Sequence, residues 1–259
     1  MNNTSALDLL LGTLHLPSML RENNSMTKRA EKENWGYDTF LLSLCEVEAL
    51  DRDHRKIERN LKKSNLPDGK TLAEFEQSRL PAAVKRQLPV LVGGVFVERA
   101  ENVLCFGLPG RGKSHLLCAI ARELIIHKGY SVLFTSTFSL VQRLLKAKQE
   151  LLIEAMLKKL DRFDVVFLDD IGYVQQSREE MEVLFTFLAE RYERKSIMIT
   201  SNLVFSQWGK IFKDPMTTAA AIDRLVHHSI ILELDAMESY RTTHAKNQKD
   251  NKKAPILRG

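Results

Sequence analysis

The sequence predicts an α/β fold in which a parallel five-stranded sheet is flanked by helices and is preceded by a small all-helical domain. From about residue 101 onward, five short apolar runs alternate with helix-length segments, and the runs cover residues 102–107, 131–136, 164–170, 196–202 and 229–234. Continuous apolar strands separated by helices are typical of a parallel sheet that is buried on both faces. Before residue 65, strand signals are few and apolar residues recur at helical spacing.

The helices between these strands are expected at about residues 113–127, 138–160, 178–194 and 216–226. The third has a defined start, because Ser177 and Glu180 have the spacing of a capping box. An apolar stripe that is expected to face the core follows this start, and it is formed by Met181, Leu184, Phe185, Leu188 and Tyr192.

The N-terminal region is predicted to be a separate helical domain that spans residues 1–69. Its apolar residues follow two helical patterns, formed by Leu7, Leu10, Leu11 and Leu14 and by Phe40, Leu41, Leu44, Val47 and Leu50. The turn signal LPDG at 66–69 ends this domain. Residues 70–100 are then expected to form a linker or docking segment, residues 101–245 the α/β domain, and the basic residues 246–259 a disordered tail.

The composition is that of an ordinary soluble globular protein, with 44% hydrophobic and 27% charged residues in a chain of 259. The net charge of +5 favours an anionic partner, but a soluble basic protein without such a partner has the same charge. No apolar run approaches the roughly 18 residues that a membrane span needs, and the N-terminus lacks the basic start of a signal peptide. Of the three cysteines, Cys45, Cys105 and Cys118, the last two are expected to be buried hydrophobes, which fits a reducing cytosol and a cytoplasmic protein.

The segment GLPGRGKS at residues 107–114 fits the phosphate-binding pattern G-x-x-x-x-G-K-[ST], and it lies between a predicted strand and a predicted helix as that pattern requires. Its glycines allow successive backbone amides to face phosphate oxygens, and the N-terminus of a helix favours negative charge. Lys113 is predicted to reach the β- and γ-phosphates of ATP, and the Ser114 hydroxyl to bind Mg²⁺. The residues assigned to nucleotide binding are Gly107, Leu108, Pro109, Gly110, Arg111, Gly112, Lys113, Ser114 and His115.

Two acids end the apolar run VVFLDD, about fifty residues after this loop. Asp169 is predicted to hold Mg²⁺, directly or through water, and Asp170 to orient the attacking water. Asp170 is one methylene shorter than a glutamate, so slow or partner-stimulated hydrolysis is expected. The alternative is a site that binds ATP without hydrolysing it. Asn202, at the end of ITSN, is expected to touch the γ-phosphate or the water, with an Asx-turn as the alternative. Arg224 is expected to complete the site of a neighbouring subunit, with a surface ion pair as the alternative.

The chain resembles AAA+ ATPases in four segments, which are GLPGRGKSHL (107–116), FDVVFLDDIGY (163–173), ITSNLVFSQWGKIF (199–212) and AAAIDRLVHHS (219–229). Their combination is similar to IstB-like transposition helper ATPases and to the related DnaC-type helicase loaders. Similarity extends to WGYDTFLLSLCEVEALDRDHRKIERNLKKSNLP (35–67), so it covers nearly the whole chain. Two loop residues depart from the family's pattern, since Leu108 and Arg111 stand where Pro and Thr are usual.

The resemblance implies the AAA+ sheet order 5-1-4-3-2 and a ring or helical homo-oligomer with ATP between subunits. It implies a sensor role for Asn202 and an arginine-finger role for Arg224, and it leaves Arg241 as the only obvious candidate for a second sensor. It also implies that a helical insertion at 137–160 faces nucleic acid.

Basic residues that are expected to contact DNA occur in two places. Arg143, Lys146 and Lys148 lie in the insertion, and the N-terminal domain contributes Arg52, Arg55, Lys56 and Arg59. Phosphate contacts of this kind predict binding that ignores sequence and falls steeply with salt, whereas a solvated surface is the alternative. The predicted function is an ATP-dependent ATPase that assembles on double-stranded target DNA and recruits or activates the cognate transposase for insertion of a mobile element.

Three other functions stay open. A helicase loader would share the ATPase motifs but would bind single-stranded DNA. A small-molecule kinase would need an acceptor pocket and an arginine-bearing lid, which the sequence does not indicate. The third is a DNA-binding scaffold that does not hydrolyse ATP, and it differs from the predicted ATPase in whether Asp170 orients the attacking water. A metal site at His227 and His228 is not predicted, because adjacent side chains are expected to point apart and no third ligand is evident.

Overall fold

The computed structural model describes residues 3–172, 177–203, 207–208 and 225–234. The chain divides into two compact units, Met1–Arg59 and Asn60–Gly259. This division falls within one long helix, whereas the sequence placed the end of the helical domain ten residues later, at the LPDG turn. Most of the helix expected at 216–226 and the whole basic tail lie outside the described residues.

The first unit is all-helical, as predicted. It contains α1 (Asn3–Thr13), α2 (Pro17–Lys32) and the larger part of α3 (Tyr37–Ser64). Leu11, Met19 and Leu44 form its small core. The two predicted apolar stripes are therefore only partly buried, since large exposed fractions remain at Leu7, Leu10, Leu14, Leu41 and Leu50. A unit of about sixty residues buries little interior, so most of these leucines remain at the surface.

A buried carboxylate joins α2 to α3. Glu48 is 4% exposed, and its Oε2 accepts hydrogen bonds from the backbone N–H groups of Ser18 at 2.8 Å and Met19 at 3.2 Å. These amides lie in the first turn of α2, where a negative charge is favourable. Burial by itself disfavours the charged form, but the two amides and the guanidinium groups of Arg52 and Arg55 outweigh it and hold the pKa of Glu48 below its ordinary value.

The second unit is built on a sheet in the order β2-β3-β4-β1-β5, in which every pair of neighbouring strands is parallel. The strands are β1 (Asn102–Phe106), β2 (Val132–Ser136), β3 (Val165–Ile171), β4 (Ser196–Ser201) and β5 (Ser229–Glu233). All five lie where the apolar runs predicted them, and the order 5-1-4-3-2 is confirmed. β1 and β4 are buried along their whole length because they lie inside the sheet and are covered on both faces.

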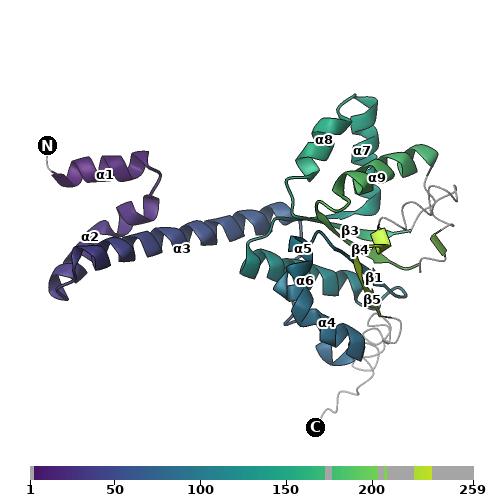
Figure 1. Cartoon of the computed structure of the whole chain (residues 1–259), viewed down its shortest axis with the longest axis horizontal. Coiled ribbons are helices and arrows are strands. Elements are labelled where there is room, and N and C mark those ends of the chain that lie inside the picture. The colour runs from purple at the N-terminus through teal and green to yellow at the C-terminus, as the bar shows by residue number, and fades with distance from the viewer. Residues whose placement is uncertain (1–2, 173–176, 204–206, 209–224, 235–259) are drawn as a thin grey trace, which may run out of the picture. The chain divides into compact units, whose positions relative to one another are not determined.

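Helices cover both faces of this sheet (Figure 1). One face carries α6 (Lys113–Lys128), with α4 (Ala82–Gly93) packed against it and the short α5 (Val95–Glu98) beside α4. The other face carries α7 (Thr137–Gln149), α8 (Ile153–Leu160) and α9 (Arg178–Arg191). A short 3₁₀ turn, η1 (Gln77–Arg79), precedes α4. The expected linker segment at 70–100 therefore contains helices that pack on the sheet domain. Within the described residues, no helix is both long and apolar enough to cross a membrane.

The prediction of a single helix at 138–160 is wrong, because the structure has two helices there. α7 ends in a Schellman motif, in which the amide of Leu151 bonds to the carbonyl of Lys148 at 3.1 Å and that of Leu152 to the carbonyl of Ala147 at 2.7 Å. Leu151 takes the left-handed backbone position of this motif, with φ of 59°. Glycine normally marks that position, so a leucine gave no sign of the break.

The predicted capping box of α9 is confirmed, with the side chains of Ser177 and Glu180 each bonded to the other's backbone amide. Met181, Leu184 and Leu188 of the predicted stripe are fully buried, whereas Phe185 and Tyr192 are half-buried. The helix ends at Arg191, three residues earlier than expected.

Arg191, the last residue of this helix, links it to the sheet through hydrogen bonds. It is 2% exposed, and its guanidinium donates hydrogen bonds of 3.0–3.2 Å to four backbone carbonyls, those of Leu160, Phe163, Asp164 and Ser196. Burial lowers the pKa of this group to about 10, so it stays protonated at neutral pH. The side chain ties α8, β3 and β4 together at one end of the sheet.

Cys105 and Cys118 are both fully buried, as predicted, while Cys45 is exposed. Burial raises the pKa of each buried thiol to about 12. Both are therefore protonated at neutral pH and act as small hydrophobic side chains.

Candidate nucleotide site

The loop between β1 and α6 has the backbone that the glycine pattern predicted. Gly110 and Gly112 have φ of 82° and 84°, which favours glycine. Gly112 is also the N-cap of α6 and supplies no capping side chain, so the first amides of this helix can face an anion. A β-carbon on Gly112 would lie 3.2 Å from the ring of Phe75, so the close packing of that ring also requires glycine.

Lys113 joins the loop to the end of β4. It is 7% exposed, and its ammonium donates to the carbonyls of Gly107 at 2.6 Å and Leu108 at 3.1 Å and to the side-chain oxygen of Asn202. The amide of Asn202 donates in turn to Oδ1 of Asp170 at 2.9 Å. The structure thus brings together the predicted phosphate-binding lysine, sensor and water-orienting acid.

Ser114 and Asp169 converge on the same point. The Ser114 hydroxyl donates to Oδ1 of Asp169 at 2.6 Å, and Thr200 donates to the same oxygen at 2.6 Å. Mg²⁺ prefers oxygen ligands in an octahedron at about 2.0–2.1 Å, which places neighbouring ligands about 3 Å apart. The hydroxyl and carboxylate oxygens of Ser114 and Asp169 therefore fit Mg²⁺ in type, and a small separation from their hydrogen-bonded distance of 2.6 Å would give the spacing of two ligands.

Asp170 lies at an irregularity in the pairing of β3 with β4, between Leu168 and Ile171. Its φ is 62°, in the left-handed region, and its amide donates to the Thr200 hydroxyl at 2.8 Å. Asp and Asn enter this region more readily than other residues with a side chain. The backbone therefore gives a reason for the shorter acid at this position.

Thr200 was missed by the sequence analysis, although it bonds to both acids. It is 1% exposed; its hydroxyl donates to the Asp169 carboxylate and accepts from the Asp170 amide. The only sequence signal was a hydroxyl residue near the end of an otherwise apolar strand, and such a residue is common in strands.

The segment before α4 packs on the start of α6, a contact that no sequence pattern indicated. His115 Nε2 donates to the carbonyl of Thr71 at 3.1 Å, and the His115 and Phe75 rings meet edge to face at 5.1 Å. The side chain of His115 is thus directed toward this segment. Arg111 Nε is buried and has no hydrogen-bond partner among the described residues, as is also true of Arg122 Nε and Arg191 Nε. At the tip of the loop, Leu108 and Pro109 are exposed.

Two predicted residues cannot be placed. Arg224, the expected arginine finger, and Arg241, the candidate second sensor, both lie outside the described residues.

The arrangement matches a known family. The family model described as IstB-like ATP binding protein matches residues 9–248. The chain belongs to this family. It is 42% identical over 250 residues to an insertion sequence ATP-binding protein of Sinorhizobium fredii, covering 96% of this chain and 83% of that relative. It is 38% identical over 251 residues to the insertion sequence IS21 ATP-binding protein of Pseudomonas aeruginosa, covering 97% and 92% of the two chains.

Solved structures place the IstB-like chain in the AAA+ fold. The DnaC helicase loader aligns with a TM-score of 0.50 at 22% identity, over 59% of this chain and 89% of the loader. The replication initiator DnaA bound to AMPPCP and single-stranded DNA aligns with a TM-score of 0.56 at 17% identity, over 75% and 58% of the two chains. At these identities the likeness concerns the fold, and it agrees with the observed strand order.

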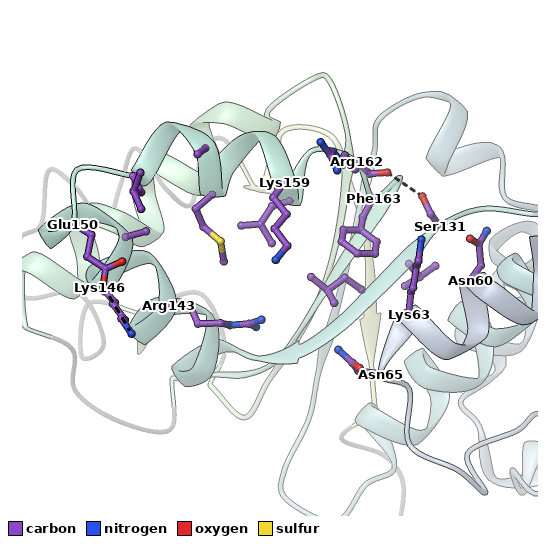
Figure 2. Close-up of a pocket in the computed structure, with 17 residues that line it drawn as sticks. Asn60, Lys63, Asn65, Ser131, Arg143, Lys146, Glu150, Lys159, Arg162 and Phe163 are labelled. Carbon is purple, nitrogen blue, oxygen red and sulfur yellow. Dashed lines mark hydrogen bonds and ion pairs between the residues drawn. The ribbon is translucent and has the colours of Figure 1, made fainter.

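The predicted DNA-binding residues of the insertion separate into two groups. Arg143 and Lys146 of α7 line a cavity of about 920 Å³ beside the edge strand β2 (Figure 2). Three more cations line the same cavity: Lys63, Lys159 and Arg162. Lys148 instead pairs with Glu182 of α9 at 2.9 Å. The cavity therefore gathers cations from α3, α7, α8 and the turn before β3.

The predicted DNA-binding residues of the first unit are partly engaged in that unit's own contacts. Arg55 pairs with Glu48 at 3.2 Å and with Asp51 at 2.9 Å, and Arg52 lies 3.4 Å from Glu48. Arg59 and Lys56 are exposed. Arg52 and Arg55 thus stabilise the buried Glu48 carboxylate in addition to any role at the surface.

Proposed function

We propose that this IstB-like protein is an ATP-hydrolysing switch that assembles on duplex DNA and recruits or activates the transposase of a mobile element. The observation that supports it most directly is the network from Lys113 through Asn202 to Asp170. This network links the phosphate loop to the acid that would orient water. The insertion-sequence context of the relatives supports the transposition role.

In the proposed reaction, Lys113 and the amides of the glycine loop bind the phosphates of ATP. Ser114 and Asp169 would hold Mg²⁺, which neutralises charge on the β- and γ-phosphates when it is bound. The Asp170 carboxylate accepts a hydrogen bond from water and directs its oxygen at the γ-phosphorus, and Asn202 holds that carboxylate in place. The water oxygen forms a bond to the γ-phosphorus while the bond from the γ-phosphorus to the bridging oxygen breaks. The proton that the water loses passes to a γ-phosphate oxygen, so the products are ADP and inorganic phosphate.

Release of the γ-phosphate would change what Asn202 and a neighbouring subunit's Arg224 contact. An oligomer that is stable with ATP would thereby become unstable after hydrolysis, which is how binding energy can drive a two-state switch. In this proposal the ATP-bound oligomer on DNA recruits the transposase. The transposase then triggers ATP hydrolysis, and hydrolysis disassembles the oligomer.

DNA would bind through phosphate contacts. The cations around the cavity beside β2 include Arg143, Lys146 and Lys159, against one acid among its lining residues, Glu150. Charge of this kind attracts DNA of any sequence and is screened by salt. We expect affinity for duplex DNA to fall steeply with ionic strength, and an Arg143→Ala plus Lys159→Ala double variant to reduce the steepness of that dependence.

The decisive experiment measures ATP turnover without DNA, with single strands and with long duplex, beside an Asp170→Asn variant. Turnover that is stimulated by duplex and lost in the variant supports the proposal. Stimulation by single strands alone points to a helicase loader. ATP-dependent duplex binding without turnover, in the presence of the transposase as well, points to a scaffold. Assembly on DNA by Lys113→Ala at parental affinity would contradict the ATP dependence of the switch.

A further inference from the structure

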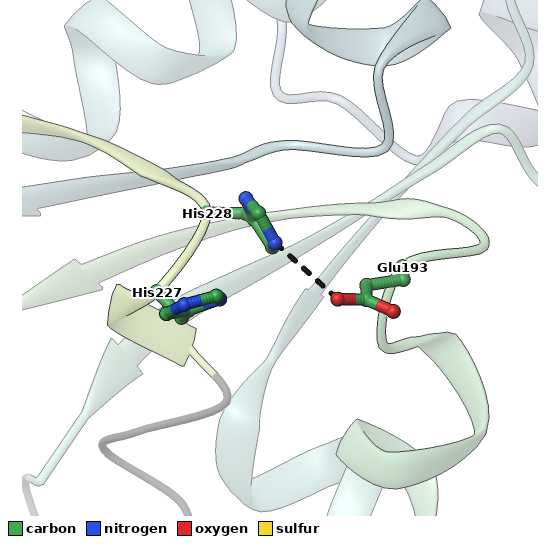
Figure 3. A group of neighbouring side chains, drawn as sticks. All are labelled: Glu193, His227 and His228. Atoms are coloured by element: carbon green, nitrogen blue, oxygen red, sulfur yellow. Dashed lines mark ion pairs between the residues drawn. The ribbon is translucent and has the colours of Figure 1, made fainter.

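Two segments distant in sequence bring three metal-ligating side chains together at the surface. Glu193 follows α9, while His227 and His228 immediately precede β5 (Figure 3). His228 Nε2 lies 3.3 Å from Glu193 Oε1, and the two imidazole rings are 4.4 Å apart at their centroids. One ligand atom from each residue lies within 4.8 Å of the other two. The expectation that the two histidines point apart with no third ligand nearby is therefore wrong, because the fold supplies Glu193.

The histidine side of this cluster has a fixed backbone. The carbonyl of His228 accepts a hydrogen bond of 2.7 Å from the amide of Asn102, the first residue of β1. The next residue, Ser229, begins β5 and donates from its hydroxyl to the carbonyl of Val226 at 3.1 Å. Only the side-chain torsions of the two histidines remain to be set by a ligand.

The carboxylate side is fixed by the end of α9. Arg191, two residues before Glu193, is buried and bonded to four carbonyls. Glu193 itself has φ of 56°, a left-handed conformation that is uncommon for a residue with a long side chain. Backbone in this region costs free energy and tends to occur at ligand-binding positions. The carboxylate of Glu193 lies 3.3 Å from His228 Nε2.

We propose that Glu193, His227 and His228 form a binding site for a divalent transition-metal ion of the zinc class. Two imidazoles and one carboxylate are the donor set that zinc and its first-row neighbours accept, whereas Mg²⁺ and Ca²⁺ prefer oxygen ligands alone. At bond lengths of about 2.0–2.1 Å, two ligands of a tetrahedral ion are about 3.4 Å apart. The pair of His228 and Glu193 already has this spacing, at 3.3 Å. The two distances that involve His227 are at most 4.8 Å, and rotation of its side chain would shorten both of them.

All three residues are exposed, so the fourth coordination position is open to water. The ion would bridge the loop after α9 to the segment before β5 and replace a single exposed ion pair by three coordinate bonds. The inference stands apart from ATP hydrolysis, because none of the three residues contacts the nucleotide site in the described structure.

The test is a titration of the full-length, tag-free protein, stripped with a chelator, with Zn²⁺ by calorimetry and with Co²⁺ by absorption spectroscopy. Excess Mg²⁺ is present throughout to fill oxygen-ligand sites, and Cys45→Ser removes the exposed thiol. We expect one equivalent to bind, with a Co²⁺ spectrum typical of nitrogen and oxygen ligands. Loss of an outer contact to a metal ligand already costs about 10–100-fold in affinity, so His228→Ala and Glu193→Gln should each weaken binding at least tenfold.

The matched control is His127, which lies 3.1 Å from Glu123 on α6. This pair offers a histidine and a carboxylate at the same spacing. Within the described residues it belongs to no three-ligand group. His127→Ala should leave the affinity for Zn²⁺ unchanged within twofold. Absence of a stoichiometric site in the parent, or equal binding by the parent and the His228→Ala variant with both folded by circular dichroism, would overturn the inference.

Discussion

Replacing Thr200 by valine tests whether the two acids are positioned by the hydroxyl between them. Valine has nearly the same shape, so the buried position keeps its packing while the hydroxyl is lost. The hydroxyl donates to the Asp169 carboxylate at 2.6 Å and accepts from the Asp170 amide at 2.8 Å. A hydrogen bond to a charged group contributes about 1.5–3 kcal/mol, and an amide left without a partner costs about 1–3 kcal/mol.

Burial of the new methyl group offsets about 1 kcal/mol of these losses. The free energy of unfolding should therefore fall by about 1.5–5 kcal/mol. The effect on function comes through Asp169, the proposed Mg²⁺ ligand. Loss of a contact to a metal ligand lowers metal affinity or activity by about 10–100-fold, which corresponds to about 1.4–2.7 kcal/mol.

Three measurements on the parent and variants test this reasoning: ATP turnover, the Mg²⁺ concentration that gives half-maximal ATP binding, and unfolding in urea. Thr200→Ser keeps the hydroxyl and should stay within a few-fold of the parent in the first two. If Thr200→Val needs no more Mg²⁺ than the parent and turns over ATP as fast, the hydroxyl does not position Asp169. Equal defects in the serine and valine variants would mean that the defect does not depend on the hydroxyl, because only the valine variant lacks it.

Three further predictions follow from the structure. Gly112→Ala should destabilise the protein by about 1–2 kcal/mol and weaken ATP binding, because the backbone φ is 84° and the added β-carbon would lie 3.2 Å from the ring of Phe75. The control is Gly12→Ala, which has open space around it and should leave stability in urea unchanged or raised. Arg191→Met should cost about 3–5 kcal/mol, because it removes four hydrogen bonds from a buried guanidinium to backbone carbonyls. Arg194→Met removes two ion pairs of exposed side chains and one exposed hydrogen bond to the carbonyl of Glu190, and it should cost less than about 1 kcal/mol. Equal urea midpoints would refute the difference. The lowered pKa of Glu48 stabilises the fold fully above its unfolded value of about 4.5, and this contribution is lost as pH falls through the folded pKa. The thermal midpoint of Glu48→Gln should therefore lie below the parent's at neutral pH and approach it as the pH falls through the lowered pKa of Glu48, and a constant gap would contradict the linkage.

The sequence alone determined the elements that depend on local pattern. The apolar runs predicted all five strands. For β1 and β4 the reason is that a strand buried on both faces needs apolar residues at nearly every position. The glycine loop and the acids at the end of β3 predicted which groups could hold phosphates and Mg²⁺, because this chemistry requires particular residues at fixed spacing. Ser177 and Glu180 predicted the start of α9, since a capping box is complete within four residues.

Tertiary structure decided what depends on contacts between distant segments or on backbone that no residue type marks. Leu151 breaks the insertion into two helices through a left-handed position that glycine usually marks. Thr200 lies between the two acids only because β3 and β4 are neighbours in the sheet, and Phe75 reaches the phosphate loop only because its segment folds back onto α6. Glu193 meets His228 across 34 intervening residues. In each case the conformation is stabilised by contacts that form only when the chain folds. A pattern confined to neighbouring residues carries no information about such contacts.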